Sequence, residues 1–377
     1  MPQVVMLSLD KPLFRGTISF NTGLFINGEF TDSVQGGEID VINPTTEKAI
    51  TSVCAGSPKD VDLAVNAALK AYKTSWGLRV PASTRGAILA KLADLVESNK
   101  EELIALEVLN TGKPWSIARD IDLKASVEIL RYYAGWADKI HGKTIEVHEN
   151  KLAYTRHEPY GVVGAIVPWN WPLMLMLTKL APALATGNTM VIKPSEFTPL
   201  TALKFAGMLN EAGIPPGVVN IVNGYGDTVG EAISHHPLIR KISFTGSTRV
   251  GRKVHEASAK SNLKSVSLEL GGKSPNIIFD DADIEQAVEW TSMGVFMNKG
   301  ETCISGSRIF VQEGIYNEFI KAFANAAATL RSTTGDPFSP STNHGPQISK
   351  VQFEASVENM LYMDVLSEKS LACSGLH

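Results

Sequence analysis

The sequence contains little cysteine. Its 377 residues include three cysteines, Cys54, Cys303 and Cys373. Three thiols at these separations make neither a disulfide framework nor the paired spacing of a zinc site. We therefore expect no metal site and a reducing environment for this protein.

Charge of one sign and long hydrophobic runs are also scarce. The 35 basic and 39 acidic residues give a net charge of -4 without a dense basic block, which argues against a nucleic-acid partner. The longest apolar stretch, Trp169 to Ala185, contains Lys179 and is too short to span a membrane. The first residues lack the basic and apolar regions of a signal peptide. We expect a cytoplasmic protein with no membrane partner.

The composition that is present, 44% hydrophobic and 20% charged residues, is that of an ordinary globular protein long enough for two domains. Residues 1–160 are predicted to be mostly helical. Ser57 and Asp60 predict the start of one helix, and another is predicted near residues 120–140. Residues 143–159 contain two β-prone runs around a turn, which predict a protruding hairpin.

From Gly161 onward, short β-branched runs alternate with helical segments. The runs from GVVGAIVP to LKSVSLEL indicate an α/β fold with a parallel, doubly wound sheet of the Rossmann type. Such a sheet binds ligands at the carboxyl ends of its strands. A second alternation begins at SPNIIFDD, where Asp283 and Gln286 predict a helix start.

One cysteine has a sequence context that suits a nucleophile. Cys303 lies in NKGETCISGSR, between a predicted helix and a predicted strand, among small and polar residues. A reactive thiolate needs such a polar, partly exposed position. A single cysteine is more often a small core residue, so this feature alone leaves both interpretations open.

Two polar residues stand at the ends of predicted strands. Glu269 in SLELGG is either a solvated carboxylate or a general base beside glycines that let a ligand approach. Asn170 in VPWNWP either caps a turn or donates a hydrogen bond to a developing oxyanion. Neither pattern by itself decides between its two interpretations.

Two further strand ends carry candidate cofactor ligands. Glu196 in VIKPSE is placed to accept a hydrogen bond from a ribose hydroxyl. Residues 246–251 open a helix after a strand, so their free N–H groups suit a pyrophosphate. Their G-x-x-x-x-G spacing differs from the G-x-G-x-x-G motif of dinucleotide-binding proteins and is weak evidence when taken alone.

The combination of these segments is more informative than any one of them. VPWNWP, VIKPSE, FTGSTRVG, LELGGKSP and the cysteine segment occur in the order and spacing of the NAD(P)-dependent aldehyde dehydrogenases, which the sequence resembles from about Leu24 to Phe353. The resemblance implies a dinucleotide-binding domain at residues 20–267, with an oligomerisation hairpin at about 141–159. It also implies an incomplete catalytic domain at 268–353.

The resemblance further implies roles for single residues. Cys303 matches the nucleophile, Glu269 the general base and Asn170 the oxyanion donor in the oxidation of a small-molecule aldehyde through a thiohemiacetal and a thioester. Lys179 matches a lysine near the active site. The expected cofactor is NAD in preference to NADP. The cofactor-binding residues are Lys193 and Glu196 at the adenosine ribose, Ser247 and Trp169 near the pyrophosphate, and Pro168, Gly246 and Gly251.

The sequence also departs from the family pattern. Glu301, Thr302 and Ile304 stand where several members carry glutamine and further cysteines, and Thr178 stands where some carry a large aromatic residue. Residues 354–377 form a divergent tail. The family's E-x-F-G-P segment, later catalytic strands and last oligomerisation strand are not found, which implies a truncated or divergent member lacking part of the homo-oligomer interface.

Two functional hypotheses follow from this comparison. The first is a working aldehyde dehydrogenase, and the second is an inactive family member that binds nucleotide or pairs with a full-length subunit. The presence of all three catalytic matches favours the first hypothesis. The missing C-terminal segments favour the second.

Overall fold

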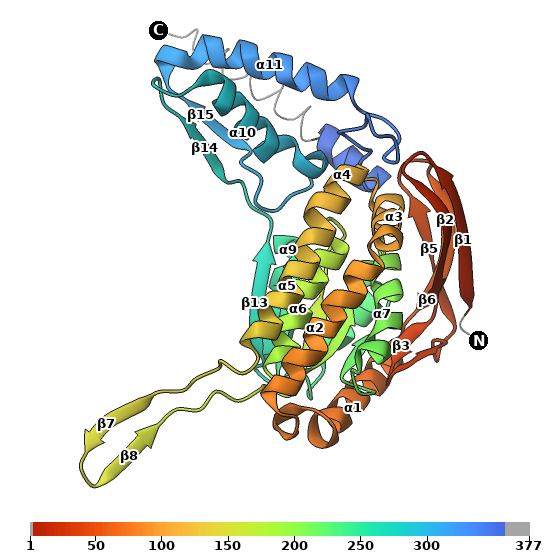
Figure 1. The fold of residues 1–377 in the computed structure, drawn as a ribbon, viewed down its shortest axis with the longest axis vertical. Coiled ribbons are helices and arrows are strands. Elements are labelled where there is room, and N and C mark those ends of the chain that lie inside the picture. Colours follow the sequence, from red (N-terminus) through yellow and green to blue (C-terminus); the bar gives the residue numbers. More distant parts are fainter. Residues whose placement is uncertain (1–2, 359–377) are drawn as a thin grey trace.

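The computed structural model describes residues 3–358. Cys373 and most of the predicted tail lie outside the described residues. The described chain forms a central sheet covered by helices, an N-terminal β-rich wall, a C-terminal lobe and a long projecting hairpin (Figure 1). In this part of the chain, no helix is long and apolar enough to cross a membrane.

The prediction of a mostly helical N-terminal segment was wrong for residues 4–55. They form six strands. In the first strand, successive residues alternate between exposed and half-buried positions. This period of two is the signature of a strand with one covered face. The strands are β1 (Val4–Lys11), β2 (Phe14–Asn21), β3 (Leu24–Ile26), β4 (Glu29–Thr31), β5 (Gly37–Asn43) and β6 (Lys48–Ala55).

Helices follow these strands. The first begins where predicted, because the Asp60 carboxylate accepts hydrogen bonds from the backbone N–H of Ser57 (2.8 Å) and from its hydroxyl (2.7 Å). The helix predicted near residues 120–140 ends earlier, at Trp136, where a Lys139 N–H to Trp136 carbonyl bond closes a turn. The segment contains α1 (Pro58–Thr74), η1 (Gly77–Arg79), α2 (Ala82–Ser98), α3 (Lys100–Thr111), α4 (Trp115–Ile117), η2 (Ala118–Leu123) and α5 (Lys124–Trp136).

The central sheet has the predicted parallel core and an unpredicted antiparallel extension. Its order is β13-β12-β9-β10-β11-β3-β4, and β3 pairs antiparallel with β11. From β9 the chain continues through β10 to β11 on one side, and then returns to form β12 and β13 on the other side. The strand order therefore reverses between β9 and β12, and doubly wound sheets bind ligands at such a switch point. The parallel strands are β9 (Val162–Ile166), β10 (Thr189–Lys193), β11 (Val219–Ile221), β12 (Lys241–Gly246) and β13 (Ser265–Leu270).

Both faces of this sheet are buried, as expected for parallel strands. In β10, Met190 and Ile192 pack into the larger core with α2, α6 and α7, whereas Val191 between them joins the smaller core with α1 and α9. The helices that complete the two layers are α6 (Pro172–Ala185), α7 (Leu200–Ala212), η3 (Gly226–Gly230), α8 (Glu231–His235) and α9 (Thr248–Lys260).

The C-terminal lobe and the hairpin leave apolar side chains exposed. Two parallel strands carry Ile277 and Phe310 with exposed fractions of 63% and 52%, and the hairpin β7 (Thr144–His148) with β8 (Lys151–Tyr154) carries Leu152 at 79%. The hairpin itself was predicted and is confirmed. The lobe consists of β14 (Pro275–Ile278), α10 (Ile284–Phe296), η4 (Met297–Gly300), β15 (Arg308–Val311), η5 (Glu313–Ile315) and α11 (Tyr316–Ser332).

Candidate active site

The carboxyl edge of the parallel sheet gathers most of the residues that the sequence singled out. Residues 168–170 follow β9, residues 194–196 follow β10, and Ser247 follows β12. Glu269 is the penultimate residue of β13 and its side chain is exposed. Carboxyl ends of parallel strands share one edge, so the topology brings together segments that are far apart in the sequence.

Cys303 reaches this region on the cysteine loop, which comprises residues 297–307. The loop begins with a left-handed run, at φ 51° for Asn298 and 66° for Lys299, and its cysteine is half-buried. A Cβ added to Gly272, just beyond β13, would lie 3.0 Å from the Cys303 carbonyl oxygen. The absent side chain of Gly272 therefore lets the cysteine loop approach the strand that carries Glu269.

The other described cysteine is in a different environment. Cys54 lies on β6 and burial raises the pKa of its thiol, with smaller contributions from neighbouring charges. A raised pKa keeps the thiol protonated and unreactive at neutral pH. Of the two described cysteines, Cys303 is therefore the one whose position at the carboxyl edge suits chemistry.

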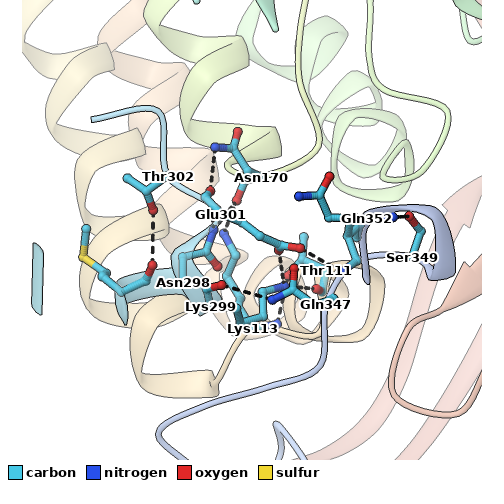
Figure 2. A network of polar contacts seen from close by, with 12 residues as sticks. Thr111, Lys113, Asn170, Asn298, Lys299, Glu301, Thr302, Gln347, Ser349 and Gln352 are labelled. Atoms are coloured by element: carbon cyan, nitrogen blue, oxygen red, sulfur yellow. Dashed lines mark hydrogen bonds and ion pairs between the residues drawn. The ribbon is translucent and has the colours of Figure 1, made fainter. Parts of the chain in front are cut away.

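Asn170 is held against the cysteine loop by its side chain and its main chain (Figure 2). Its amide Nδ2 donates to the Glu301 carbonyl at 2.8 Å. Its own carbonyl accepts from Lys113 Nζ at 3.0 Å and from Asn298 Nδ2 at 3.1 Å. An amide nitrogen has two N–H donors, so one donor of Asn170 remains after the bond to Glu301, which lies two residues before Cys303 in the loop.

A buried lysine accompanies Glu269. Lys179 Nζ donates to Ser243 Oγ at 3.1 Å, and burial lowers the pKa of this lysine to about 8 against the opposing charge of Glu269. Lys179, Ser243 and Thr178 line a cavity of about 680 Å³ on the α6 side of the sheet. The structure thus places Lys179 within the electrostatic range of the candidate base.

The candidate cofactor residues flank the switch point, at the ends of β9 and β10 on one side and of β12 on the other. Lys193 is buried, and its Nζ lies 2.9 Å from Glu196 Oε2. Ser247 caps α9 by accepting from the Val250 N–H, while Gly251 is buried against Leu270. Pro168, Trp169 and Gly246 are half-buried beside them.

A cavity that the sequence did not predict adjoins Lys193. It measures about 450 Å³ and lies between η3, α8 and α9, with Ile166 at the end of β9 in its wall. Gly230 approaches Lys193 from this side, because a Cβ added there would lie 3.7 Å from Lys193 Cδ. Gly226 and Gly230, before a short helix, were the one signal in the sequence that pointed to this cavity.

A buried ionic cluster beneath Asn170 was also missed. Lys113 Nζ lies 2.7 Å from Asp122 Oδ2 and 3.9 Å from Glu107 Oε1, and all three side chains have 0% exposure. Burial raises the pKa of Glu107 and places that of Asp122 well above its usual range, although Lys113 opposes both shifts. We therefore expect one of the two carboxyls to keep its proton beside the single ammonium, because uncompensated charge is costly in the interior.

The retained proton makes the free energy of unfolding depend on pH. A carboxyl whose pKa is raised by folding holds a proton that the unfolded chain has released, so stability is present at low pH and is lost as pH rises. From about pH 4 upward through its raised pKa, Asp122 is expected to lower the free energy of unfolding by up to about 1.4 kcal/mol per pH unit. Urea unfolding at a series of pH values measures this slope.

Asp122→Asn is expected to reduce the slope, because the amide still accepts from Lys113 and leaves Glu107 to ionise beside it. Asp94→Asn, on the exposed face of α2, is the control and should keep the wild-type slope. A difference in unfolding free energy between the wild type and Asp122→Asn that stays constant between about pH 4 and the neutral range would contradict the retained proton.

Within residues 3–358, no group of three or more His, Cys, Asp or Glu side chains is placed to hold a metal ion. The order of the parallel strands and the polar carboxyl edge define a protein of the doubly wound, nucleotide-binding class. Comparisons with known proteins make this class more specific.

Residues 30–374 match the model of the aldehyde dehydrogenase family. The chain is 54% identical to the aldehyde dehydrogenase of Agaricus bisporus over 94% of its own length and 70% of that protein. It is 50% identical to retinaldehyde dehydrogenase 3 of Homo sapiens over 93% of its length and 68% of that protein. The NAD+ complex of the Bacillus cereus aldehyde dehydrogenase aligns with a TM-score of 0.86 at 45% identity, covering 88% of this chain and 67% of that one.

The protein belongs to the aldehyde dehydrogenase family. This membership confirms the resemblance and the α/β fold inferred from the sequence. The chain spans about 70% of the length of the Agaricus bisporus relative.

Proposed function

We propose that this protein oxidises a small-molecule aldehyde to a carboxylic acid with NAD as the hydride acceptor, using Cys303, Glu269 and Asn170. The observation that carries the proposal is the hydrogen bond of 2.8 Å from the Asn170 amide to Glu301, two residues before Cys303. It keeps an oxyanion donor beside the nucleophile. Family membership supplies the reaction class.

The residues act in sequence. The Cys303 thiolate attacks the aldehyde carbon, and the free N–H of Asn170 donates to the oxygen as it becomes an alkoxide. NAD, when bound, would supply the acceptor for the hydride that leaves that carbon, and loss of the hydride converts the alkoxide adduct into a thioester on Cys303. Glu269 then takes a proton from water, which attacks the thioester and releases the acid and the thiolate.

The residues present fit the cofactor. The cavity of about 450 Å³ has apolar walls from Ile166, Val250 and Val254, which suit an adenine ring. Glu196 pairs with Lys193, which Gly230 of the cavity wall approaches, and its carboxylate is suited to accept from the adenosine ribose. The N-terminus of α9 adds free N–H groups for a pyrophosphate.

Cofactor choice depends on the charge of Glu196 in this arrangement. A 2′-phosphate in place of a ribose hydroxyl would face this carboxylate, at a cost of up to about 4 kcal/mol before screening. NAD is therefore preferred, and Glu196→Gln should narrow the preference by roughly tenfold or more. The ratio kcat/KM for NAD over NADP measures it, with Glu211→Gln on the exposed face of α7 as the control. If the wild-type enzyme prefers NADP, Glu196 does not bind the adenosine ribose.

The direct test is to incubate the purified 377-residue chain with NAD and propanal, following NADH by absorbance and propanoate by NMR. Equal amounts of NADH and propanoate are expected. Propanoate without NADH, or neither product at saturating NAD, would contradict the proposed reaction.

A second candidate function is nucleotide binding without turnover, in association with another subunit of the family. The exposed apolar residues of the hairpin and of the β14–β15 pair favour association, because such patches on soluble proteins mark interaction surfaces. The two candidates differ in one result. A thermal shift with NAD and an oligomeric mass by light scattering, without NADH formation, would select the second.

We further propose a two-domain organisation and a cytoplasmic location. Residues 20–267 form the dinucleotide-binding domain with the hairpin as its oligomerisation arm, and residues 268–353 belong to the catalytic domain. The scarcity of cysteine and the reactive thiol proposed for Cys303 suit the cytoplasm. Limited proteolysis between the two segments and cell fractionation test these two statements.

A further inference from the structure

A second buried ion pair lies inside the cysteine loop itself. Lys299 Nζ is 2.8 Å from Glu301 Oε2, and each side chain has an exposed fraction of 1%. Buried pairs of this kind stabilise a fold weakly, because desolvation offsets most of the attraction. The position of this pair, two residues from Cys303, therefore calls for a role beyond general stability.

The pair connects the cysteine loop to two distant segments (Figure 2). Lys299 Nζ donates to the carbonyl of Thr111, the last residue of α3, at 2.7 Å. Glu301 Oε1 accepts from the Ile348 N–H at 3.0 Å, and Gln347 Nε2 donates to the Lys299 carbonyl at 3.1 Å. The two charged side chains thus hold the loop between α3 and residues 347–348.

The loop needs this external support because its backbone is unfavourable. Asn298 and Lys299 have φ values of 51° and 66°, in the left-handed region that side chains other than glycine rarely adopt. Such a conformation persists only where surrounding contacts determine it. The contacts of Lys299 and Glu301 are among those that do so.

The position of the Glu301 main chain sets the direction of the Asn170 amide. One Asn170 N–H is used by the Glu301 carbonyl, at 2.8 Å. The planar geometry of the amide then fixes where the second N–H points. A shift of the loop at Glu301 would move both Cys303 and the direction of the free Asn170 donor.

We propose that Lys299 and Glu301 are positioning residues for the oxyanion site, because their buried ion pair places the Glu301 carbonyl that orients the Asn170 amide toward the substrate of Cys303. This inference rests on the proposed function, which gives Asn170 and Cys303 their roles. Neither charged side chain touches the substrate. Their effect passes through the loop backbone.

Two reactions of Cys303 separate orientation of the amide from simple exposure of the thiol. Acylation by p-nitrophenyl acetate forms an oxyanion and needs the Asn170 donor, whereas alkylation by iodoacetamide is a displacement that forms none. Neither reaction needs NAD. The ratio of the acylation rate to the alkylation rate, with the Cys303 adduct located by mass spectrometry, therefore reports the oxyanion donor.

The variants are chosen to keep shape while changing charge. Glu301→Gln keeps an acceptor for the Ile348 N–H but leaves Lys299 buried without its carboxylate. The double variant Lys299→Gln with Glu301→Gln restores a neutral pair that can hydrogen-bond internally and to Thr111. Glu102→Gln, which breaks the Lys204–Glu102 pair of 2.6 Å away from this loop, is the matched control.

The ratio of acylation rate to alkylation rate should fall at least about tenfold in Glu301→Gln. This is part of the loss expected when an oxyanion donor is removed. The double variant should recover to within about threefold of the wild type, and Glu102→Gln should match the wild type. If Glu301→Gln does not fold, the double variant still tests the proposal. A ratio in the double variant that is as low as in Asn170→Ala would overturn it.

Failure of the inference and failure of the proposed function give different results. If Asn170→Ala lowers the ratio but Glu301→Gln leaves it unchanged, the ion pair does not position the amide. Equal falls in acylation and alkylation in Glu301→Gln would also overturn it, since they indicate general loosening. If the wild type is not acylated at Cys303, or Asn170→Ala has the wild-type ratio, the proposed function fails and the inference fails with it.

Discussion

Cys303→Ala is expected to abolish NADH formation from an aldehyde and the hydrolysis of p-nitrophenyl acetate. Both reactions pass through a covalent bond to this sulfur, so removal of the thiol should lower both rates by roughly 10⁴-fold or more, to the background. The alanine is smaller and the site is half-buried, so the fold should survive. The measurements are NADH absorbance, nitrophenolate release and the thermal unfolding midpoint.

Cys54→Ala is the matched control for this variant. Its thiol is also half-buried, but it lies on β6, away from the carboxyl edge of the sheet. Both activities should stay within about twofold of the wild type, since a core thiol acts as a small apolar residue. If Cys303→Ala still oxidises an aldehyde, Cys303 is not the nucleophile.

Glu269→Gln is expected to slow the second half of the reaction more than the first. Hydride transfer needs no carboxylate at this position, whereas activation of water for hydrolysis of the thioester does. Rapid mixing with NAD and aldehyde should show a burst of NADH close to the enzyme concentration. Steady turnover should then be slower than in the wild type by about 10²–10⁴-fold.

Glu289→Gln on α10 provides the control, because this exposed carboxylate lies in the C-terminal lobe outside the proposed site. It should preserve both the burst and the steady rate. Equal losses of burst and steady rate in Glu269→Gln would assign Glu269 to acylation or to structure. Full activity would leave it as the solvated strand-end residue that the sequence also allowed.

Much of the fold could be predicted from residues 161–278 because local signals agree there. Each strand is a short apolar run, each helix has a matching period, and glycine or proline separates them. Gly187, for example, follows α6 with a φ of 86°, which glycine adopts readily. Five motifs in family order then identified the reaction class, because catalytic residues stand at strand ends.

Two of the N-terminal strands could not be predicted in the same way. Strands β3 and β4 have three residues each, too few for a period to emerge. Strand β3 pairs with β11 at Phe25 and Ile221, which are 196 residues apart, and β4 pairs with β3. Local propensity contains no information about such a partner.

The sequence by itself determined the family, the parallel sheet and the residues proposed for chemistry, because these are encoded in short motifs and in the periodicity of apolar residues. Only the tertiary structure decided which charged residues are buried. Lys113, Asp122, Lys299 and Glu301 read as ordinary surface residues in the sequence, yet they lie under the candidate site with at most 1% of each side chain exposed. Burial and ion pairing depend on segments more than a hundred residues apart, such as Thr111 and Lys299, which meet only when the sheet assembles.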